Sequence, residues 1–306
     1  MPDFSIILPC FNAETTIVET LQSITAQTFG DWEAICVDDG STDATVPLIQ
    51  NAALIDPRIR LVRNQGKGPS SARNTGALDH SSGGLIAFCD ADDLWLPTKL
   101  AELAKSFAKA EVGGAFGQIG FFQDAPDDAN VFSTVPEQDL TIDMLMGENP
   151  VCTMSNMTVR RDIFVQSGGF DVSMVHNEDL DWLIRVVGGG ARIIGLRSLQ
   201  TWYRTSVGGL STNLDAMLAG RARAIASAAA FGVRPSARSH AIHHRYLARR
   251  ALRLGANRTD ALRHSVAGFV HSPVGFLTPL RRGAPTLAGA LVATLLPHPL
   301  RRYLFS

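Results

Sequence analysis

The feature that most constrains the fold is the alternation of short apolar runs with helix signals through the first third of the chain. Four runs have the length and the content of β-branched and aromatic residues that strands favour. They span residues 4–8, 32–37, 59–62 and 85–89. Between the first two runs, Ile17, Leu21 and Ile24 repeat at the spacing of one helical face. This order predicts an α/β domain with a mostly parallel sheet flanked by helices, in which ligands bind beyond the carboxyl ends of the strands.

The pattern changes after residue 112. Residues 113–213 continue with strand-like and helical segments but lose the regular alternation, and residues 214–270 have helical character. At 306 residues the chain is long enough for one large α/β domain and an appendage. We therefore predict an α/β domain over residues 1–213, divided at residue 112, and a basic helical region over residues 214–306.

The net charge of −1 hides a strong asymmetry. Residues 214–306 carry 14 Arg and no Lys against two Asp, which gives +12 and leaves −13 for residues 1–213. Basic helices with apolar positions suit an anionic membrane surface. A helical bundle that packs on the rest of the chain, or forms a homodimer, is the alternative, and the sequence leaves both open. No recognised nucleic-acid-binding module accompanies the positive charge, so we expect no nucleic-acid partner.

The cysteines and the longest apolar run bear on the compartment. The cysteines are Cys10, Cys36, Cys89 and Cys152. They form no C-x-x-C pair, which favours free, mostly buried thiols in a reducing compartment. The N-terminal run is short and lacks the basic leader of a signal peptide, and the apolar stretch 287–296 falls below the roughly 18 residues of a spanning helix. We expect a cytoplasmic protein, with the inner face of the plasma membrane as a place of contact.

An acidic cluster follows the fourth apolar run. Asp90, Asp92 and Asp93 repel one another and resist burial, and a bound divalent cation would relieve both effects. Magnesium-type sites often combine one or two carboxylates with substrate phosphates. The other interpretation is an acidic turn that leads into the next helix. The same D-x-D spacing occurs again at Asp179 and Asp181, so the spacing alone does not decide.

Eight short segments carry a more specific signal when they are taken in order. They are SIILPCFN at 5–12, QTF at 27–29, VDDGSTD at 37–43, GPSSARN at 68–74, DADD at 90–93, GGFD at 168–171, NEDLDW at 177–182 and WYR at 202–204. Together they resemble family 2 of the inverting nucleotide-sugar glycosyltransferases. No single segment decides, but the full set at these spacings is highly specific. The resemblance covers roughly residues 3–210, and residues 211–306 show no such match.

The resemblance implies a fold of the GT-A type, with a Rossmann-like nucleotide-binding part in residues 1–112 and an acceptor part in residues 113–213. Asp39 would hydrogen-bond the nucleobase of the donor with help from Asp38, because a carboxylate accepts from a pyrimidine or guanine N–H. Without the family, these two residues read as a turn and a helix cap. The other residues implied in donor binding are Pro9 and Phe11 at the base, Arg73 at the phosphate or base, Asp90 at the ribose, and Arg204, which begins a segment that folds over the diphosphate in relatives.

The same resemblance assigns the chemistry to carboxylates. Asp92 would bind a divalent cation, Mn²⁺ or Mg²⁺, and Asp90 would contact the ribose or a metal-bound water. The cation would neutralise charge on the departing diphosphate. Asp179 would act as the general base toward the acceptor hydroxyl, with Glu178 and Asp181 as competing candidates. Without the family, these three residues read as an acidic first turn favoured by the helix dipole.

These implications combine into one predicted activity. We predict a metal-dependent inverting glycosyltransferase that moves a sugar from a nucleotide-diphospho-sugar, with UDP as the expected nucleotide, to a saccharide or lipid-linked saccharide. The implied setting is surface polysaccharide or glycolipid biosynthesis. A nucleotidyltransferase would need a basic phosphate-gripping loop near the N-terminus, and residues 9–12 offer none. A non-catalytic sugar-nucleotide-binding protein is disfavoured by the intact Asp92 and Asp179.

Overall fold

The computed structural model of the chain describes residues 1–205, 214–254 and 257–305. The chain divides into two compact units. Unit 1 comprises Met1–Leu140 and Pro150–Ser227, and unit 2 comprises Thr141–Asn149 and Ala228–Ser306. The division therefore falls inside the helix that follows residue 213, and a short segment from the predicted acceptor part belongs with the C-terminal helices.

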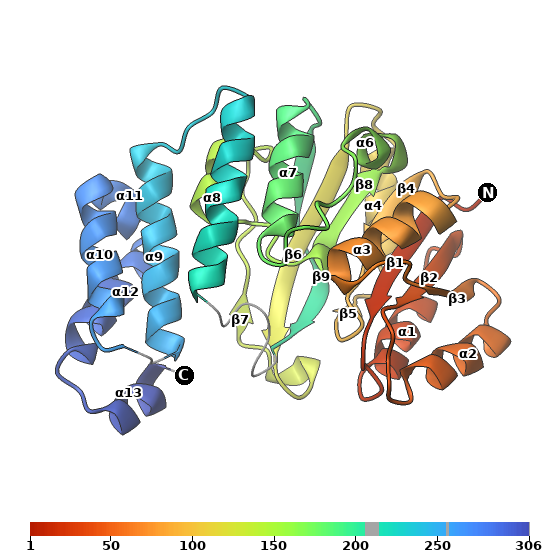
Figure 1. Ribbon diagram of the computed structural model, residues 1–306, viewed down its shortest axis with the longest axis horizontal. Coiled ribbons are helices and arrows are strands. Elements are labelled where there is room, and N and C mark those ends of the chain that lie inside the picture. The colour runs from red at the N-terminus through yellow and green to blue at the C-terminus, as the bar shows by residue number, and fades with distance from the viewer. Residues whose placement is uncertain (206–213, 255–256, 306) are drawn as a thin grey trace. The chain divides into compact units, whose positions relative to one another are not determined.

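A mixed sheet forms the frame of unit 1 (Figure 1). The order of its strands is β3-β2-β1-β4-β8-β6-β9-β5, and β7 pairs with β6. The strands are β1 Phe4–Cys10, β2 Trp32–Asp38, β3 Ile59–Arg63, β4 Leu85–Phe88, β5 Leu94–Trp95, β6 Gly114–Phe122, β7 Val131–Phe132, β8 Met157–Arg160 and β9 Ile193–Arg204. The half made of β3, β2, β1 and β4 is parallel, as the alternation of strand and helix signals predicted.

The other half of the sheet reverses direction at β8. This strand runs antiparallel to both of its neighbours, β4 and β6, whereas β6 and β9 run parallel. The short strand β5 pairs antiparallel with β9, so that Leu94 lies beside Trp202. This pairing brings the acidic loop after β4 next to the carboxyl end of β9.

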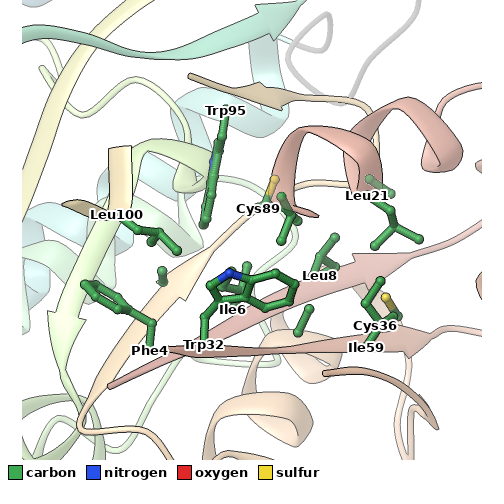
Figure 2. Packing of buried hydrophobic residues seen from close by; sticks show 14 of the residues in the cluster. Phe4, Ile6, Leu8, Leu21, Trp32, Cys36, Ile59, Cys89, Trp95 and Leu100 are labelled. Atoms are coloured by element: carbon green, nitrogen blue, oxygen red, sulfur yellow. The ribbon is translucent and has the colours of Figure 1, made fainter. Parts of the chain in front are cut away.

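Helices cover both faces of the sheet. The α-helices of unit 1 are α1 Ile17–Thr25, α2 Thr45–Ile55, α3 Gly68–Asn74, α4 Lys99–Phe107, α6 Arg161–Gln166, α7 Glu178–Gly188 and α8 Leu214–Ala230, which crosses the division between the units. Successive side chains of a strand point to opposite faces. Ile6 and Leu8 of β1 therefore share one buried cluster with Leu21 of α1 and Leu100 of α4 (Figure 2).

The opposite face carries an aromatic cluster. Phe88 at the end of β4 packs against Phe164 of α6, Phe170 and Trp182 of α7, with ring centroids 5.4–6.1 Å apart. Trp182 is fully buried, and its Nε1 donates to Ser167 Oγ at 2.9 Å. This aromatic residue of the NEDLDW segment is thus part of the core that fixes the start of α7.

The cysteines form no disulfide among the described residues. Cys10, Cys36 and Cys89 are buried, as expected, and Cys152 is exposed. The thiols of Cys36 and Cys89 lie within the cluster shown in Figure 2.

Unit 2 is helical in the part of the chain that the structure describes. Its complete helices are α5 Ile142–Gly147, α9 Ala237–Leu254, α10 Asp260–His271, α11 Pro273–Leu277, α12 Leu280–Ala293 and α13 His298–Phe305. Large apolar side chains remain on its surface, among them Val270, Leu295 and Tyr303, which are 79%, 85% and 84% exposed. Among the described residues, no helix combines the length and the apolar character needed to cross a membrane.

Candidate functional site

Two neighbouring carboxylates at the end of β2 have different partners. Asp38 accepts hydrogen bonds from two backbone N–H groups of its own turn, at 3.1 and 3.0 Å. Asp39 accepts from Asn64 Nδ2 at 2.6 Å and from the Gly68 N–H at 2.9 Å. Gly68 has a φ of 84°, a left-handed conformation that glycine adopts without strain. Asp38 therefore closes the turn, while Asp39 is held at the carboxyl ends of the parallel strands.

The loop after β1 is tied to the loop after β2. The Asn12 N–H donates to Ser41 Oγ at 3.0 Å, and Asn12 Oδ1 accepts from the Thr42 N–H at 2.8 Å. Phe11 is 58% exposed, whereas Pro9 is partly buried in β1. The two predicted base-packing residues thus lie at the carboxyl end of β1, where an exposed ring can stack on a nucleobase.

Arg73 joins the two acidic motifs. Its Nη2 lies 2.7 Å from Asp90 Oδ1, and its Nη1 lies 3.2 Å from Glu178 Oε1. The guanidinium is buried, and these two carboxylates keep the pKa of Arg73 above its usual value against the effect of burial. A charge-assisted bridge of this kind fixes both partners strongly. One side chain of α3 therefore brings together segments that are far apart in the sequence.

Asn74, the next residue, makes a second connection. Its Nδ2 donates to the Phe170 carbonyl at 2.8 Å, and its Oδ1 accepts from the Phe170 N–H at 2.9 Å. This pair of hydrogen bonds holds the GGFD segment, which precedes α7, against α3.

Asp90 is also held by the segment that precedes β8. Its backbone N–H donates to Ser155 Oγ at 2.9 Å, and its Oδ2 accepts from Thr153 Oγ1 at 3.3 Å. Both oxygens of the Asp90 carboxylate therefore have partners, one from Arg73 and one from Thr153.

Asp92 has the environment of a carboxylate that a cation would stabilise. Burial and the negative charge of Asp90 raise the pKa of Asp92 to about 6. A divalent cation would favour the ionised form of both carboxylates, and oxygen donors suit Mn²⁺ or Mg²⁺. Over the described residues, no group of three or more His, Cys, Asp or Glu side chains could hold a metal ion. The oxygen donors of Asp90 and Asp92 fit a site that two carboxylates share with the phosphates of a substrate.

Arg204 and Asp93 fasten the acidic loop to β9. The Arg204 N–H donates to Asp93 Oδ1 at 3.0 Å, and Asp93 is fully buried. The Arg204 guanidinium donates to the Asp92 carbonyl at 3.1 Å and lies 2.5 Å from Glu19 Oε2. These contacts make Arg204 a support of the loop. The segment predicted to fold over the diphosphate continues into residues 206–213, which are outside the described residues.

The first turn of α7 presents three carboxylates with different surroundings. Burial, with the charge of Asp179, raises the pKa of Glu178 to about 7, although Arg73 opposes this shift. Burial also raises the pKa of Asp179. Asp181 points elsewhere, because it pairs with Arg185 at 2.9 Å and accepts from Ser227 Oγ at 2.5 Å. The structure thus separates Asp181 from the candidate bases and brings Glu178 to Arg73.

Several supporting residues were missed by the sequence analysis. Lys99 is buried and donates to the Ser155 carbonyl at 2.7 Å and to Thr201 Oγ1 at 2.9 Å. Burial lowers the pKa of Lys99 to about 7. The polar Thr153, Ser155 and Asn64 were likewise not singled out. A signal existed for two of them, because Thr153 and Ser155 belong to a set of polar residues, with Asn156 and Thr158, inside the strand-like segment 151–159.

Two solved structures show a fold similar to that of this chain. The structure of S. aureus TarS 1-349 in complex with UDP-GlcNAc matches with a TM-score of 0.65 and 15% identity, over 94% of this chain and 90% of that one. The mannosyltransferase PcManGT from Pyrobaculum calidifontis, in complex with GDP-Man and Mn²⁺, matches with a TM-score of 0.61 and 22% identity, over 99% of this chain and 84% of that one. The fold is therefore that of the GT-A glycosyltransferases, as predicted.

Sequence comparison gives the family. Residues 5–168 match the description "Glycosyl transferase family 2". WfgD of Escherichia coli, a UDP-Glc:alpha-D-GlcNAc-diphosphoundecaprenol beta-1,3-glucosyltransferase, is 32% identical over 68% of this chain and 79% of its own. TuaG of Bacillus subtilis, a putative teichuronic acid biosynthesis glycosyltransferase, is 28% identical over 69% of this chain and 82% of its own. The chain belongs to glycosyl transferase family 2, which confirms the resemblance seen in its motifs.

Proposed function

We propose that this glycosyltransferase is metal-dependent and inverting, and that it moves a sugar from a UDP-sugar to a hydroxyl group of a lipid-linked saccharide. The observation that carries the proposal is the bridge of Arg73 between Asp90 and Glu178. It joins the motif proposed to hold the donor to the motif proposed to activate the acceptor. The two halves of one reaction centre are therefore linked by a single buried side chain.

Asp39 and Phe11 are the proposed nucleobase contacts. Asn64 and Gly68 orient the Asp39 carboxylate, which can accept from the N–H of uracil. Phe11 offers an exposed ring for stacking, with Pro9 behind it and Asp38 closing the neighbouring turn. Uracil is preferred because the name of WfgD carries a UDP-sugar, whereas the GDP-Man bound to PcManGT makes guanine the competitor to test.

Asp92 and Asp90 are the proposed ligands of Mn²⁺ or Mg²⁺. When bound, such a cation supplies positive charge for the departing diphosphate. Arg73 and Thr153 orient Asp90, and Arg204 orients the loop through the Asp92 carbonyl. The binding of manganese in the PcManGT structure supports the choice of metal.

Asp179 is the proposed general base. A carboxylate whose pKa is raised toward neutrality accepts a proton more readily, and burial raises the pKa of Asp179. The acceptor hydroxyl would lose its proton to this carboxylate while its oxygen attacks the anomeric carbon opposite the diphosphate. Direct displacement from that side inverts the anomeric configuration. Glu178 remains the second candidate, although its contact with Arg73 favours a role in orientation.

The proposed acceptor is linked to a membrane lipid, and the proposed place of action is the inner face of the membrane. WfgD is named for a diphosphoundecaprenol-linked acceptor. Unit 2 combines exposed apolar residues on α10, α12 and α13 with a large excess of arginine. Basic and apolar side chains on one helical unit suit an anionic membrane surface.

The decisive test is the variant Asp179→Asn. We expect UDP-sugar binding to remain, because the variant leaves the donor contacts intact, and sugar transfer to fall by about 100-fold or more, the usual effect of losing a general base. The matched control is Asp127→Asn, which removes an exposed carboxylate from a loop of the same unit. Transfer at the control rate would remove Asp179 from the mechanism, and a glycosidic product of retained configuration would refute inversion.

The donor and the metal are tested by thermal stability. A ligand that binds the native state alone raises the unfolding temperature. We expect stabilisation by UDP-sugars that requires Mn²⁺ or Mg²⁺ and is weaker for GDP-sugars. The variant Asp92→Asn should lose the metal-dependent part. Stabilisation that is identical with and without metal would contradict the assignment of Asp92.

A further inference from the structure

Unit 2 contains an arginine cluster that has no role in the proposed reaction. We use this name for Arg245 and Arg249 of α9 and Arg282 of α12, which surround Glu148 after α5. The shortest N–O distances to the Glu148 carboxylate are 3.6, 3.8 and 3.3 Å. All four residues belong to unit 2.

Three guanidinium groups share the Glu148 carboxylate. Charge-assisted N–H···O bonds are typically about 2.7–2.9 Å long, and all three distances here exceed that range. The cluster therefore keeps an excess of two positive charges at a carboxylate that is spread among three partners. Burial lowers the pKa of Arg245 and of Arg249, and the charge of Glu148 opposes the shift in both.

The charged neighbour of Arg249 outside the cluster is also positive. The positive charges of Arg253, Arg282 and Arg245 all lower the pKa of Arg249. By sequence, unit 2 carries 12 Arg against Asp143, Glu148 and Asp260. Asp143 accepts hydrogen bonds from Ser236 at the start of α9.

Arg245 forms a rigid floor for the cluster. Its side chain is 4% exposed, and its Nη1 donates to the carbonyls of Phe276 and Thr278. Its buried Nε has no hydrogen-bond partner among the described residues. Arg249, Arg282 and Glu148 are reachable, with side chains that are 29%, 23% and 25% exposed. A buried and hydrogen-bonded arginine beside two accessible ones is an arrangement that suits an anion.

We propose that the arginine cluster is a binding site for a phosphate or diphosphate group, with Glu148 as an internal competitor that the ligand displaces. Guanidinium groups match the geometry of phosphate oxygens, and a dianion compensates the two excess charges that Glu148 leaves. The group is carried either by a lipid or by a soluble molecule. The inference rests on the residues of unit 2 alone, so it stands or falls independently of the proposed sugar transfer.

The first test measures the binding of inorganic pyrophosphate to the full-length chain by calorimetry, in EDTA so that metal-dependent binding at Asp92 is absent. We expect the double variant Arg249→Gln/Arg282→Gln to bind at least about tenfold more weakly, because two charge-assisted contacts are lost. The control is Arg234→Gln/Arg263→Gln, which removes the same charge from exposed positions of unit 2. Equal losses in both double variants would refute a specific site.

The second test uses Glu148→Gln. If Glu148 only crosslinks the helices, this change lowers the unfolding temperature and leaves pyrophosphate affinity unchanged, which overturns the proposal. If Glu148 competes with the ligand, the affinity rises, by about threefold to tenfold for a partly exposed charge. Should this variant fail to fold, the comparison of the two arginine variants still decides.

The source of the phosphate is distinguished with vesicles. Phosphatidylcholine vesicles that contain phosphatidic acid are compared with vesicles of equal surface charge that contain phosphatidylserine. Preference for phosphatidic acid that disappears in Arg249→Gln/Arg282→Gln supports a lipid headgroup as the ligand. Pyrophosphate binding without that preference supports a soluble ligand. A failure of wild-type protein to bind either pyrophosphate or phosphatidic acid refutes the site.

Discussion

Lys99 yields a prediction whose size follows from its burial. The side chain is 1% exposed and donates to Ser155 and Thr201, and burial lowers its pKa to about 7. In the unfolded chain a lysine has a pKa of about 10.4. Between these two values the unfolded state binds about one more proton than the native state. The stability of the native state therefore rises with pH across this window.

The magnitude is about 1.4 kcal/mol per pH unit for one proton, so Lys99 should add about 2 kcal/mol of stability between pH 8 and pH 9.5. Buried Cys10 and Cys89 act in the opposite direction, because their pKa values are raised and the unfolded thiols ionise first. A comparison of the wild type with Lys99→Met removes these shared contributions. The difference between the two isolates Lys99.

The assay is urea unfolding at pH 8.0, 8.5, 9.0 and 9.5. The control is Lys105→Met, which removes an exposed lysine from the same helix, α4, and should leave the pH dependence unchanged. We expect the stability of wild type relative to Lys99→Met to increase steadily over this range. A relative stability that stays constant would refute the reasoning, and would mean that Lys99 remains charged, with buried Asp93 as its counter-ion.

Three further changes test the site and its frame. Arg73→Met should lower sugar transfer by about 100-fold, equivalent to about 2.7 kcal/mol of transition-state stabilisation, because Asp90 and Glu178 lose their shared partner. Steady-state kinetics would measure this loss, and circular dichroism would check that folding is unchanged. A normal rate would contradict a role of the Arg73 bridge in sugar transfer. Asn64→Asp should weaken UDP binding by about tenfold, because a second carboxylate would stand where an amide now donates to Asp39 at 2.6 Å. The control is Ser106→Asp in α4, which should leave the calorimetric affinity for UDP unchanged. Trp182→Ala should destabilise unit 1 by about 3–5 kcal/mol in urea unfolding, since the ring is fully buried among three phenylalanines, and a loss below about 1 kcal/mol would mean that the cluster repacks around the gap.

The frame of residues 1–112 was predictable because its signals are local. Each parallel strand is a short apolar run, and each run ends at a turn or cap that the sequence displays, as at Asp38 and Asp90. The ordered motifs then led to the family, which the comparisons confirmed. The antiparallel insertion of β8 between β4 and β6 was not visible, because pairing between distant strands leaves no local pattern.

The supporting contacts of the site were hidden for the same reason. That Arg73 reaches Glu178 depends on how α3 and α7 pack, and no spacing in the sequence encodes it. Lys99 looked like an ordinary helical lysine, because burial of a charge is decided by its tertiary surroundings. Asp181 competed with Glu178 as an alternative to Asp179 until its partners separated it from the other two.

The two adjacent side chains Arg73 and Asn74 have a consequence for building hybrid enzymes from this family. Arg73 pairs with Glu178 at the start of α7, and Asn74 hydrogen-bonds the backbone of Phe170. A crossover placed after residue 112 would exchange α7 and the Phe170 segment while leaving both of their anchors in the first part of the chain. In such a hybrid, Arg73 and Asn74 would face a segment from another protein that lacks matched partners for them. These two residues and the segments that they bind should therefore be transplanted together.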